Sequence, residues 1–215
     1  MVTHVVLGGS GLVGHYLLKA LPSAFPGDRI IALARSSWQA PEGVEVRTID
    51  FTHLPQQASL FAAAYVYIAL GTTMAKAGSK EAFRYVDYEL VVQAARLAAQ
   101  QGAMQLHVVS AIGANSRSKF FYNRVKGEME DALQPLAIPS IYCYHPSILD
   151  GPRQERRVGE QTGLQVMKLL APLMVGRLRN ARPIHARQVA QAMVHYANTP
   201  QPGYHVISSA TMQRI

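Results

Sequence analysis

The sequence is poor in features that would mark a secreted or membrane protein. Cys143 is the only cysteine in 215 residues, so no internal disulfide can form and a reducing compartment is expected. No run approaches the roughly 18 consecutive apolar residues of a membrane helix, and no basic segment precedes the first apolar run. We therefore expect no membrane span, no secretory signal and a cytoplasmic location.

The sequence also lacks clustered charge, despite a formal net charge of +8. Its arginines are densest between Arg153 and Arg187, but no aromatic residues alternate with them as in a nucleic-acid groove. A solvated basic surface explains this pattern better than nucleic-acid binding does. The eight histidines are scattered, without the spacing of metal ligands, so no metal site is expected.

What the sequence does contain is a regular alternation of apolar runs and helical patterns. With 49% apolar and 16% charged residues, the chain can bury a full core as one domain spanning 1–215. Strands are predicted at 3–7, 29–34, 44–49, 65–70, 105–110, 140–145 and 204–208, and helices at 12–21, 54–62, 80–101, 121–134, 161–171 and 186–197. Nearly continuous apolar strands separated by helices predict an α/β fold with a doubly wound parallel sheet. Polar loops near 150–185 predict a small region on the substrate side.

A glycine-rich turn lies between the first strand and the first helix. It runs from Gly8 to Gly14, and its predicted cofactor-binding residues are Gly8, Ser10, Gly11, Leu12 and Gly14. The first glycine permits a tight turn, the second lets the backbone approach a pyrophosphate, and the third lets the helix pack closely on the strand. The helix N-terminus then offers unpaired N–H groups to phosphate. The pattern predicts a dinucleotide-binding site.

Residues at the ends of the next strands indicate which dinucleotide binds. Arg35 and Ser36 follow the second strand, where an acid would bind the ribose 2′-hydroxyl and an arginine suits a 2′-phosphate. NADP(H) is therefore expected in preference to NAD(H). Asp50 and Phe51 follow the third strand and are predicted to meet the adenine.

Gly71 and Thr72 follow the fourth strand, where the backbone would pass the pyrophosphate and the nicotinamide ribose.

Three further residues have a spacing that suits proton transfer. Ser110 ends the fifth strand, and Tyr122 and Lys126 lie four apart on a predicted helix, so they share one face. The lysine ammonium would lower the pKa of the tyrosine, which could then act as a general acid or base. Ser110 could orient a substrate oxygen.

With these motifs, nearly the whole chain resembles the short-chain dehydrogenase/reductase superfamily. Within it, Tyr85–Tyr88, 109–114 and 121–128 resemble an atypical branch that includes the Tat-interacting tumour-suppressor oxidoreductase and its bacterial relatives. The resemblance implies Ser110, Tyr122 and Lys126 as the catalytic residues and places Pro146 beside the nicotinamide. One departure is Asp87, where many members have an asparagine that holds a proton-relay water.

The sequence therefore predicts an NADP(H)-dependent oxidoreductase that interconverts a carbonyl and an alcohol on a small-molecule substrate. Arg153 or Arg156 would bind an anionic group of that substrate. The alternative is a nucleotide-binding regulatory or scaffold protein with little turnover, which the basic surface and the small substrate region favour. Nucleic-acid binding rests on net charge alone, and a homodimer is the other partner considered.

Overall fold

The central element is one seven-stranded sheet in which every strand is parallel to its neighbours, in the order β3-β2-β1-β4-β5-β6-β9. The structure is a computed structural model and describes residues 1–151, 180 and 182–215. The strands are β1 (Thr3–Leu7), β2 (Arg29–Ala34), β3 (Val44–Thr48), β4 (Tyr65–Ile68), β5 (Gln105–Val109), β6 (Ser140–His145) and β9 (Gly203–Ser208). A separate two-stranded pairing joins β7 (Leu149–Asp150) to β8 (Ile184–His185).

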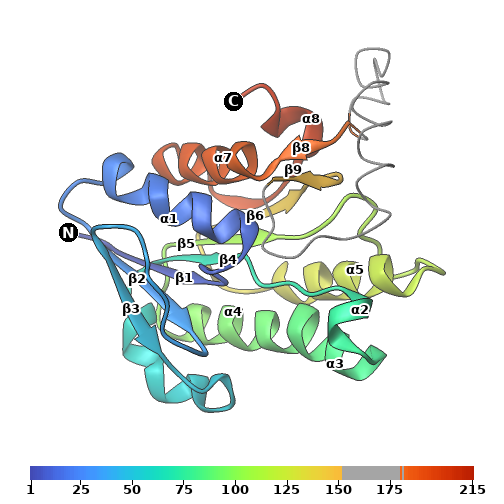
Figure 1. Cartoon of the computed structure of the whole chain (residues 1–215), viewed down its shortest axis with the longest axis horizontal. Helices are drawn as coiled ribbons and strands as arrows, with labels where there is room; N and C mark the ends of the chain where they lie inside the picture. The colour runs from blue at the N-terminus through green and yellow to red at the C-terminus, as the bar shows by residue number, and fades with distance from the viewer. Residues whose placement is uncertain (152–179, 181) are drawn as a thin grey trace.

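Helices cover both faces of the sheet, as Figure 1 shows. One face carries α1 (Leu12–Ala24) and α7 (Ala186–Asn198), and the other carries α4 (Leu90–Gln100) and α5 (Phe121–Leu133). The remaining elements are η1 (Phe51–Phe61), α2 (Met74–Ala77), α3 (Lys80–Arg84), η2 (Tyr85–Glu89) and α8 (Ser209–Met212). Two apolar cores, one on each side of the sheet, result from this sandwich. The predicted doubly wound α/β fold is confirmed.

The strand predictions were accurate because buried parallel strands are short, apolar and bounded by polar turns. The bounds of β1, β2 and β6 are those predicted, and the other sheet strands differ by one or two residues. The helix predicted at 80–101 is interrupted by the π-helical turn η2, and the one at 54–62 is the 3₁₀ segment η1. The predicted helix 161–171 lies outside the described residues.

One feature of the α1/α7 face was not expected. Five aromatic or imidazole rings from five strands stack side by side across the sheet, and we call them the ring ladder: His4, Tyr67, His107, Tyr142 and His205. Successive ring centroids are 5.8, 4.8, 5.0 and 5.1 Å apart, with interplanar angles between 13° and 21°. The last four rings occupy directly paired positions on β4, β5, β6 and β9, so the register itself builds the stack.

Candidate functional site

The glycine-rich turn lies where the strand order reverses, between β1 and β4. In open parallel sheets ligands bind at this point, beyond the carboxyl ends of the strands. Gly8 has φ +85, and a Cβ there would lie 2.5 Å from the carbonyl oxygen of Ala69, just after β4. A Cβ on Gly14 would lie 2.2 Å from the carbonyl oxygen of Gly8. Only glycine fits these two positions, so the turn holds the start of α1 tightly against both strands.

The middle of the turn remains open to a ligand. Gly11 is the N-cap of α1, its N–H donates to the Gly8 carbonyl at 2.9 Å, and Ser10 and Gly11 are both exposed. Leu12, partly buried, begins the helix, whose first N–H groups have no side-chain cap. Unpaired N–H groups at an exposed helix N-terminus suit a phosphate, so the residues present fit a dinucleotide.

Arg35 and Ser36 are exposed directly after β2, beside this turn. Within the described residues, the Arg35 guanidinium makes no hydrogen bond or ion pair, so it is available to an anionic group. Trp38, the only tryptophan, lies close to the glycine turn: a Cβ on Gly9 would be 3.3 Å from its ring. The indole is thus a natural reporter of ligand binding there.

The two residues predicted to meet adenine differ from each other. Asp50 is exposed, but one of its oxygens accepts from the Thr52 N–H at 2.9 Å as the N-cap of η1. Phe51 is only 6% exposed and belongs to the core on the α4/α5 face. The Phe51 ring thus packs mainly in the core, and its contact with an adenine stays a prediction.

The tyrosine and lysine of the predicted catalytic pair lie one turn apart on α5. The Tyr122 side chain is 41% exposed and packs edge-on against Phe83 with ring centroids 5.7 Å apart. Lys126, one turn further into the helix, is only 3% exposed. The helix therefore presents a phenol to the surface above a buried ammonium.

The buried ammonium has a partner that joins three elements. Lys126 Nζ lies 2.8 Å from Asp87 Oδ1, and Asp87, on η2, is 1% exposed. The other oxygen, Asp87 Oδ2, accepts a hydrogen bond of 2.8 Å from the Thr72 N–H after β4. Gly71 lies against the same carboxylate, since a Cβ there would be 3.5 Å from Asp87 Oδ1. Predicted cofactor residues and the catalytic pair are thus linked through Asp87.

This ion pair changes the electrostatics expected of Tyr122. Burial raises the pKa of Tyr122, the nearby Lys126 lowers it, and Asp87 raises it again, so that the net direction is upward. Burial lowers the pKa of Lys126, but Asp87, Tyr122 and Glu130 outweigh burial and raise it, which keeps the ammonium charged. The predicted net lowering of the Tyr122 pKa is therefore corrected, because burial of the phenol, the largest cause, acts together with Asp87 and outweighs the ammonium.

Ser110 has a partner that the sequence did not indicate. Its hydroxyl, 4% exposed, donates to Glu130 Oε1, which also lies 2.8 Å from His145 Nε2. Tyr204 donates to the second oxygen of Glu130 at 3.5 Å. The single hydroxyl hydrogen of Ser110 is therefore committed to Glu130 and is not directed at Tyr122. Glu130 lies one turn beyond Lys126 on α5, which is the signal that could have identified it.

Pro146 directly follows β6 and is buried, and its carbonyl accepts from the Ile112 N–H at 3.0 Å. This bond fixes the chain after β6 against the chain after β5. Both segments thus leave the carboxyl edge of the sheet together, on the side where α5 begins. The location of Pro146 is compatible with its predicted place beside a nicotinamide.

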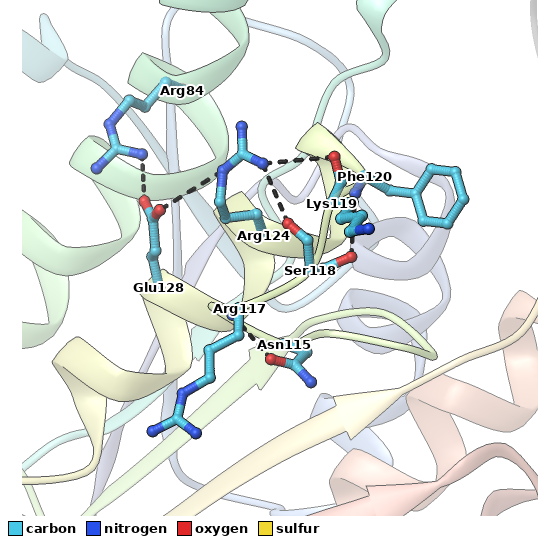
Figure 2. A network of polar contacts seen from close by, with 8 residues as sticks. All are labelled: Arg84, Asn115, Arg117, Ser118, Lys119, Phe120, Arg124 and Glu128. Carbon is cyan, nitrogen blue, oxygen red and sulfur yellow. Dashed lines mark hydrogen bonds and ion pairs between the residues drawn. The ribbon is translucent and has the colours of Figure 1, made fainter.

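The loop that leads into α5 is held by the network in Figure 2. The guanidinium of Arg124 donates to the carbonyl oxygens of Ser118 and Lys119 at 3.1 and 3.5 Å. Glu128 pairs with Arg84 of α3 and lies 4.0 Å from Arg124 Nε. Phe120, 76% exposed, points its ring away from this network. These contacts fix the start of α5, and with it Tyr122, against α3.

Other predicted features can be placed only in part. Arg153 and Arg156 lie outside the described residues. Among residues 1–151, 180 and 182–215, no group of three His, Cys, Asp or Glu side chains could hold a metal ion. Within the same ranges, no helix combines the length and apolar character needed to cross a membrane.

Comparison with known proteins supports the fold and the family resemblance. Residues 4–208 match the model of the family described as NAD dependent epimerase/dehydratase. "Protein FMP52, mitochondrial" from Lodderomyces elongisporus is 31% identical over 210 residues, covering 90% of this chain and 85% of the relative. "Protein HTATIP2" from Rattus norvegicus is 32% identical over 160 residues, covering 72% and 66%.

A solved structure gives the same architecture at low identity. The Bordetella bronchiseptica enzyme WbmH, in complex with NAD+, superposes with a TM-score of 0.70 at 11% identity. The match covers 100% of this chain and 78% of that one. At this identity the likeness shows a shared fold alone.

The comparison contradicts the expected cytoplasmic location. Curated relatives from three organisms are named as mitochondrial proteins. The prediction rested on the single cysteine and on the lack of a membrane span and a secretory signal. A low cysteine count indicates a reducing compartment without distinguishing one such compartment from another. The cytoplasmic prediction is therefore wrong.

The resemblance to short-chain dehydrogenases and reductases, in contrast, is confirmed by a family match that spans nearly the whole chain. The glycine-rich turn at the β1/β4 reversal and the Tyr122–Lys126 pair both belong to that matched segment. The chain belongs to the NAD dependent epimerase/dehydratase family.

Proposed function

We propose that this protein is an NADP(H)-dependent oxidoreductase that interconverts a carbonyl and an alcohol on a small molecule. The observation that carries the proposal is the half-exposed Tyr122 above the buried Lys126, on the helix that follows β5. This pair lies on α5, which packs on the same sheet that carries the exposed glycine turn. Lys126 is linked to the chain after β4 through Asp87 and Thr72. A tyrosine open to solvent above a fixed cation suits proton transfer to or from a substrate oxygen.

In this proposal each residue has a separate task. A nicotinamide cofactor, when bound, supplies or accepts the hydride. Tyr122 transfers the proton at its phenolic oxygen, and Lys126 provides a fixed positive charge beneath it. Gly8 and Gly14 let the N-terminus of α1 approach the pyrophosphate, and Thr72 and Pro146 border the nicotinamide side. Ser110 donates its hydroxyl hydrogen to Glu130, and its oxygen can still accept a hydrogen bond from a substrate hydroxyl.

The preference for NADP(H) over NAD(H) rests on Arg35 and Ser36. Both are exposed after β2, and Arg35 makes no polar contact within the described part of the chain. An arginine there can pair with a 2′-phosphate through charge-assisted hydrogen bonds. NAD(H) lacks that phosphate and would leave the guanidinium without a partner.

A regulatory or scaffold protein that binds the nucleotide without turnover is the second candidate. The observation that favours it is the commitment of the Ser110 hydrogen to Glu130, which removes one donor for a substrate carbonyl. The intact Tyr122–Lys126 pair favours the enzyme, because nucleotide binding alone does not need an exposed phenol.

The two candidates are separated by a turnover screen combined with nucleotide binding. Aldehydes, ketones and alcohols are incubated with the protein and NADPH or NADP⁺, and nicotinamide absorbance is followed. Binding is measured independently through the fluorescence of Trp38. The enzyme proposal expects both binding and turnover, whereas binding without turnover on any substrate would favour the regulatory candidate.

Gly11→Val supplies the control for the location of the site. Gly11 has an ordinary negative φ of −78, which a branched residue can adopt, although a Cβ there would lie 3.1 Å from the Gly8 carbonyl oxygen and would need a small shift of the turn. The side chain would project where a phosphate must approach. The variant should fold, as circular dichroism would show, and should lose nucleotide binding. Normal binding by a folded variant would place the phosphate elsewhere.

A further inference from the structure

The loop between β5 and α5 presents an aromatic ring to solvent. Phe120, the N-cap of α5, is 76% exposed, the highest value for a large apolar side chain in the described residues apart from the N-terminal Met1. Its ring points away from the polar network of Figure 2, and within the described part of the chain it contacts no other ring. Removal of this surface from water would be favourable, so the ring is available to an apolar partner.

The exposure of this ring is built into the loop. The Ser118 N–H donates to the Asn115 carbonyl oxygen at 2.9 Å, and the Arg117 N–H donates to Asn115 Oδ1 at 2.8 Å. The Phe120 N–H donates to Ser118 Oγ at 3.2 Å, and Arg124 of α5 donates to the Ser118 carbonyl oxygen at 3.1 Å. The backbone before the ring is therefore held in one conformation, and that conformation directs the ring outward.

Cationic side chains accompany this ring. Arg117 and Lys119 are exposed in the same loop, and within the described residues neither side chain makes an ion pair. Lys80 of α3 is also exposed and lies 5.6 Å from the centroid of the first ring of α5. Of the acids nearby, Glu128 is engaged with two arginines, and Glu81 is a single charge beside Lys80. The surface around the ring is therefore net positive.

Two aliphatic side chains complete this surface at the same end of the molecule. Met74 begins α2 and is 40% exposed, and Ile112 lies shortly after β5 and is 41% exposed. Because α3 packs against α2 and its Lys80 reaches the start of α5, the three segments adjoin, as Figure 1 shows. We call this set the basic apolar rim: Met74, Lys80, Ile112, Arg117, Lys119 and Phe120.

We propose that the basic apolar rim docks this protein on an anionic lipid membrane. The Phe120 ring enters the boundary between head groups and acyl chains, while the three cations of the rim contact lipid phosphates. An exposed apolar patch bordered by polar groups is typical of a membrane or protein interaction site. Docking of this kind needs no spanning helix, and none is found among the described residues. The inference does not rest on the proposed enzyme activity.

The composition of the rim favours lipid over nucleic acid, the other common anionic partner. A single-stranded nucleic acid binds successive exposed rings on which its bases stack. Here the next two rings in the chain, Phe121 and Tyr122, both pack on Phe83, with centroids 5.6 and 5.7 Å away, which leaves one free ring. The other exposed apolar side chains of the rim, Met74 and Ile112, are aliphatic and suit acyl chains rather than bases.

The test is co-sedimentation of the full chain with lipid vesicles. The protein is mixed with vesicles of phosphatidylcholine alone, or of phosphatidylcholine with about one third phosphatidylglycerol, and the bound fraction is measured. We expect binding to the anionic vesicles to be at least about tenfold stronger, because each cation near such a surface contributes about a factor of five. Raising the salt from about 0.1 M to about 0.5 M should release most of the protein.

Two variants separate the apolar and the electrostatic contributions. Phe120→Ser should weaken binding to the anionic vesicles by about tenfold or more, and Lys119→Gln by about fivefold. The matched controls are Met104→Ser, which replaces a 45% exposed side chain before β5 at the opposite edge of the sheet, and Lys19→Gln on the exposed side of α1. Neither control should change the binding.

A fluorescent reporter locates the docking surface directly. The emission of Phe120→Trp should shift to the blue on anionic vesicles, since the new indole leaves water, whereas the wild-type protein, with Trp38 alone, should show no such shift. An unshifted emission from vesicle-bound Phe120→Trp would place the contact elsewhere and overturn the proposal.

Three further results would also overturn it. One is absence of binding to anionic vesicles, including the case in which an acidic peptide or an oligonucleotide binds instead. Another is equal binding to neutral and anionic vesicles. The third is an equal loss of binding in Lys19→Gln and Lys119→Gln, which would show attraction by net charge alone. All these measurements omit cofactor and substrate, so failure of the proposed enzyme activity remains a separate outcome of the turnover screen.

Discussion

The ring ladder and the Tyr122 site both bury ionisable side chains against the same sheet, yet they are built in opposite ways. In the ladder, His107 is 0% exposed and each of its ring nitrogens has a neutral partner, Tyr144 at 2.9 Å and Gln105 at 2.9 Å. At the site, a charged pair, Lys126 and Asp87, lies directly beneath a tyrosine that is 41% exposed.

The difference shows what separates a structural cluster from a candidate active site. At His107, burial of a ring whose two nitrogens both have neutral partners gives a rigid and chemically inert group. Burial of an ion pair below an accessible phenol holds charge ready where a ligand can reach it. Perturbed titration occurs in both regions, since burial lowers the pKa of His107 to about 3 and raises that of Tyr122, so perturbation alone does not identify function.

The largest effect expected from this contrast is on turnover. Tyr122→Phe keeps the ring packed on Phe83 and removes the transferable proton, so kcat should fall by about 10²–10⁴-fold while nucleotide binding is retained. Tyr85→Phe is the control, because Tyr85 is 38% exposed on the neighbouring η2 and has no assigned task. The kcat of each variant is measured by steady-state kinetics on any substrate found in the screen. If both variants keep the wild-type kcat, the role assigned to Tyr122 is wrong.

The next effect is a loss of stability in mild acid, which belongs to the ladder. The folded pKa of His107 is about 3, against 6.5 for an unperturbed histidine, so the unfolded chain binds the extra proton between these values. Stability from this source is complete above pH 6.5 and is lost as the pH falls towards 3. The free energy of unfolding should drop by about 2 kcal/mol between pH 7.5 and pH 5 from His107 alone.

Urea denaturation at a series of pH values, followed through Trp38, measures this dependence. The pKa of His4 is also lowered by burial, so part of the slope should remain after His107 is replaced. His107→Gln should reduce the number of protons taken up on unfolding, which sets the slope of the free energy of unfolding against pH, by about one. An unchanged slope in a folded variant would show that the imidazole is not buried in its neutral form.

An effect of similar size is expected from a single hydroxyl in the ladder. Tyr67 is 0% exposed, and its hydroxyl lies 3.0 Å from His4 Nδ1, so Tyr67→Phe leaves a buried nitrogen without its partner. We expect a loss of about 1–3 kcal/mol in the free energy of unfolding, with no change in nucleotide affinity. The exposed Tyr85→Phe serves again as the control, and weakened nucleotide binding by Tyr67→Phe would mean that the two regions are coupled.

The sequence predicted the sheet well and the site only partly, for a physical reason. Strand patterns and the glycine turn are local, so β1, β2, β6 and the turn could be located from periodicity and spacing. Contacts between distant segments are not local. Asp87 attracted notice only as a departure from a resemblance, and nothing in the spacing showed that it would contact Lys126.

The same limit applies to the packing of two predicted site residues. A serine at a strand end can direct its hydroxyl to either side, and here Ser110 donates to Glu130, which lies two turns beyond Tyr122 on α5. Phe51 follows a strand as predicted, but its ring enters the core on the α4/α5 face. The ring ladder depends on strand register across β4, β5, β6 and β9, which the sequence does not specify.

The central claim, that the open edge beside the glycine turn is an NADP(H) site, is tested most directly by calorimetric titration of NADPH and NADH. A charge-assisted contact contributes about 1.5–3 kcal/mol, so NADPH should bind at least about tenfold more tightly, and Arg35→Ala should remove that advantage. Arg29→Ala, at the other end of β2 and paired with Glu45, should leave both affinities unchanged. Equal affinities of the wild type for the two cofactors, or no binding of either, would contradict the account.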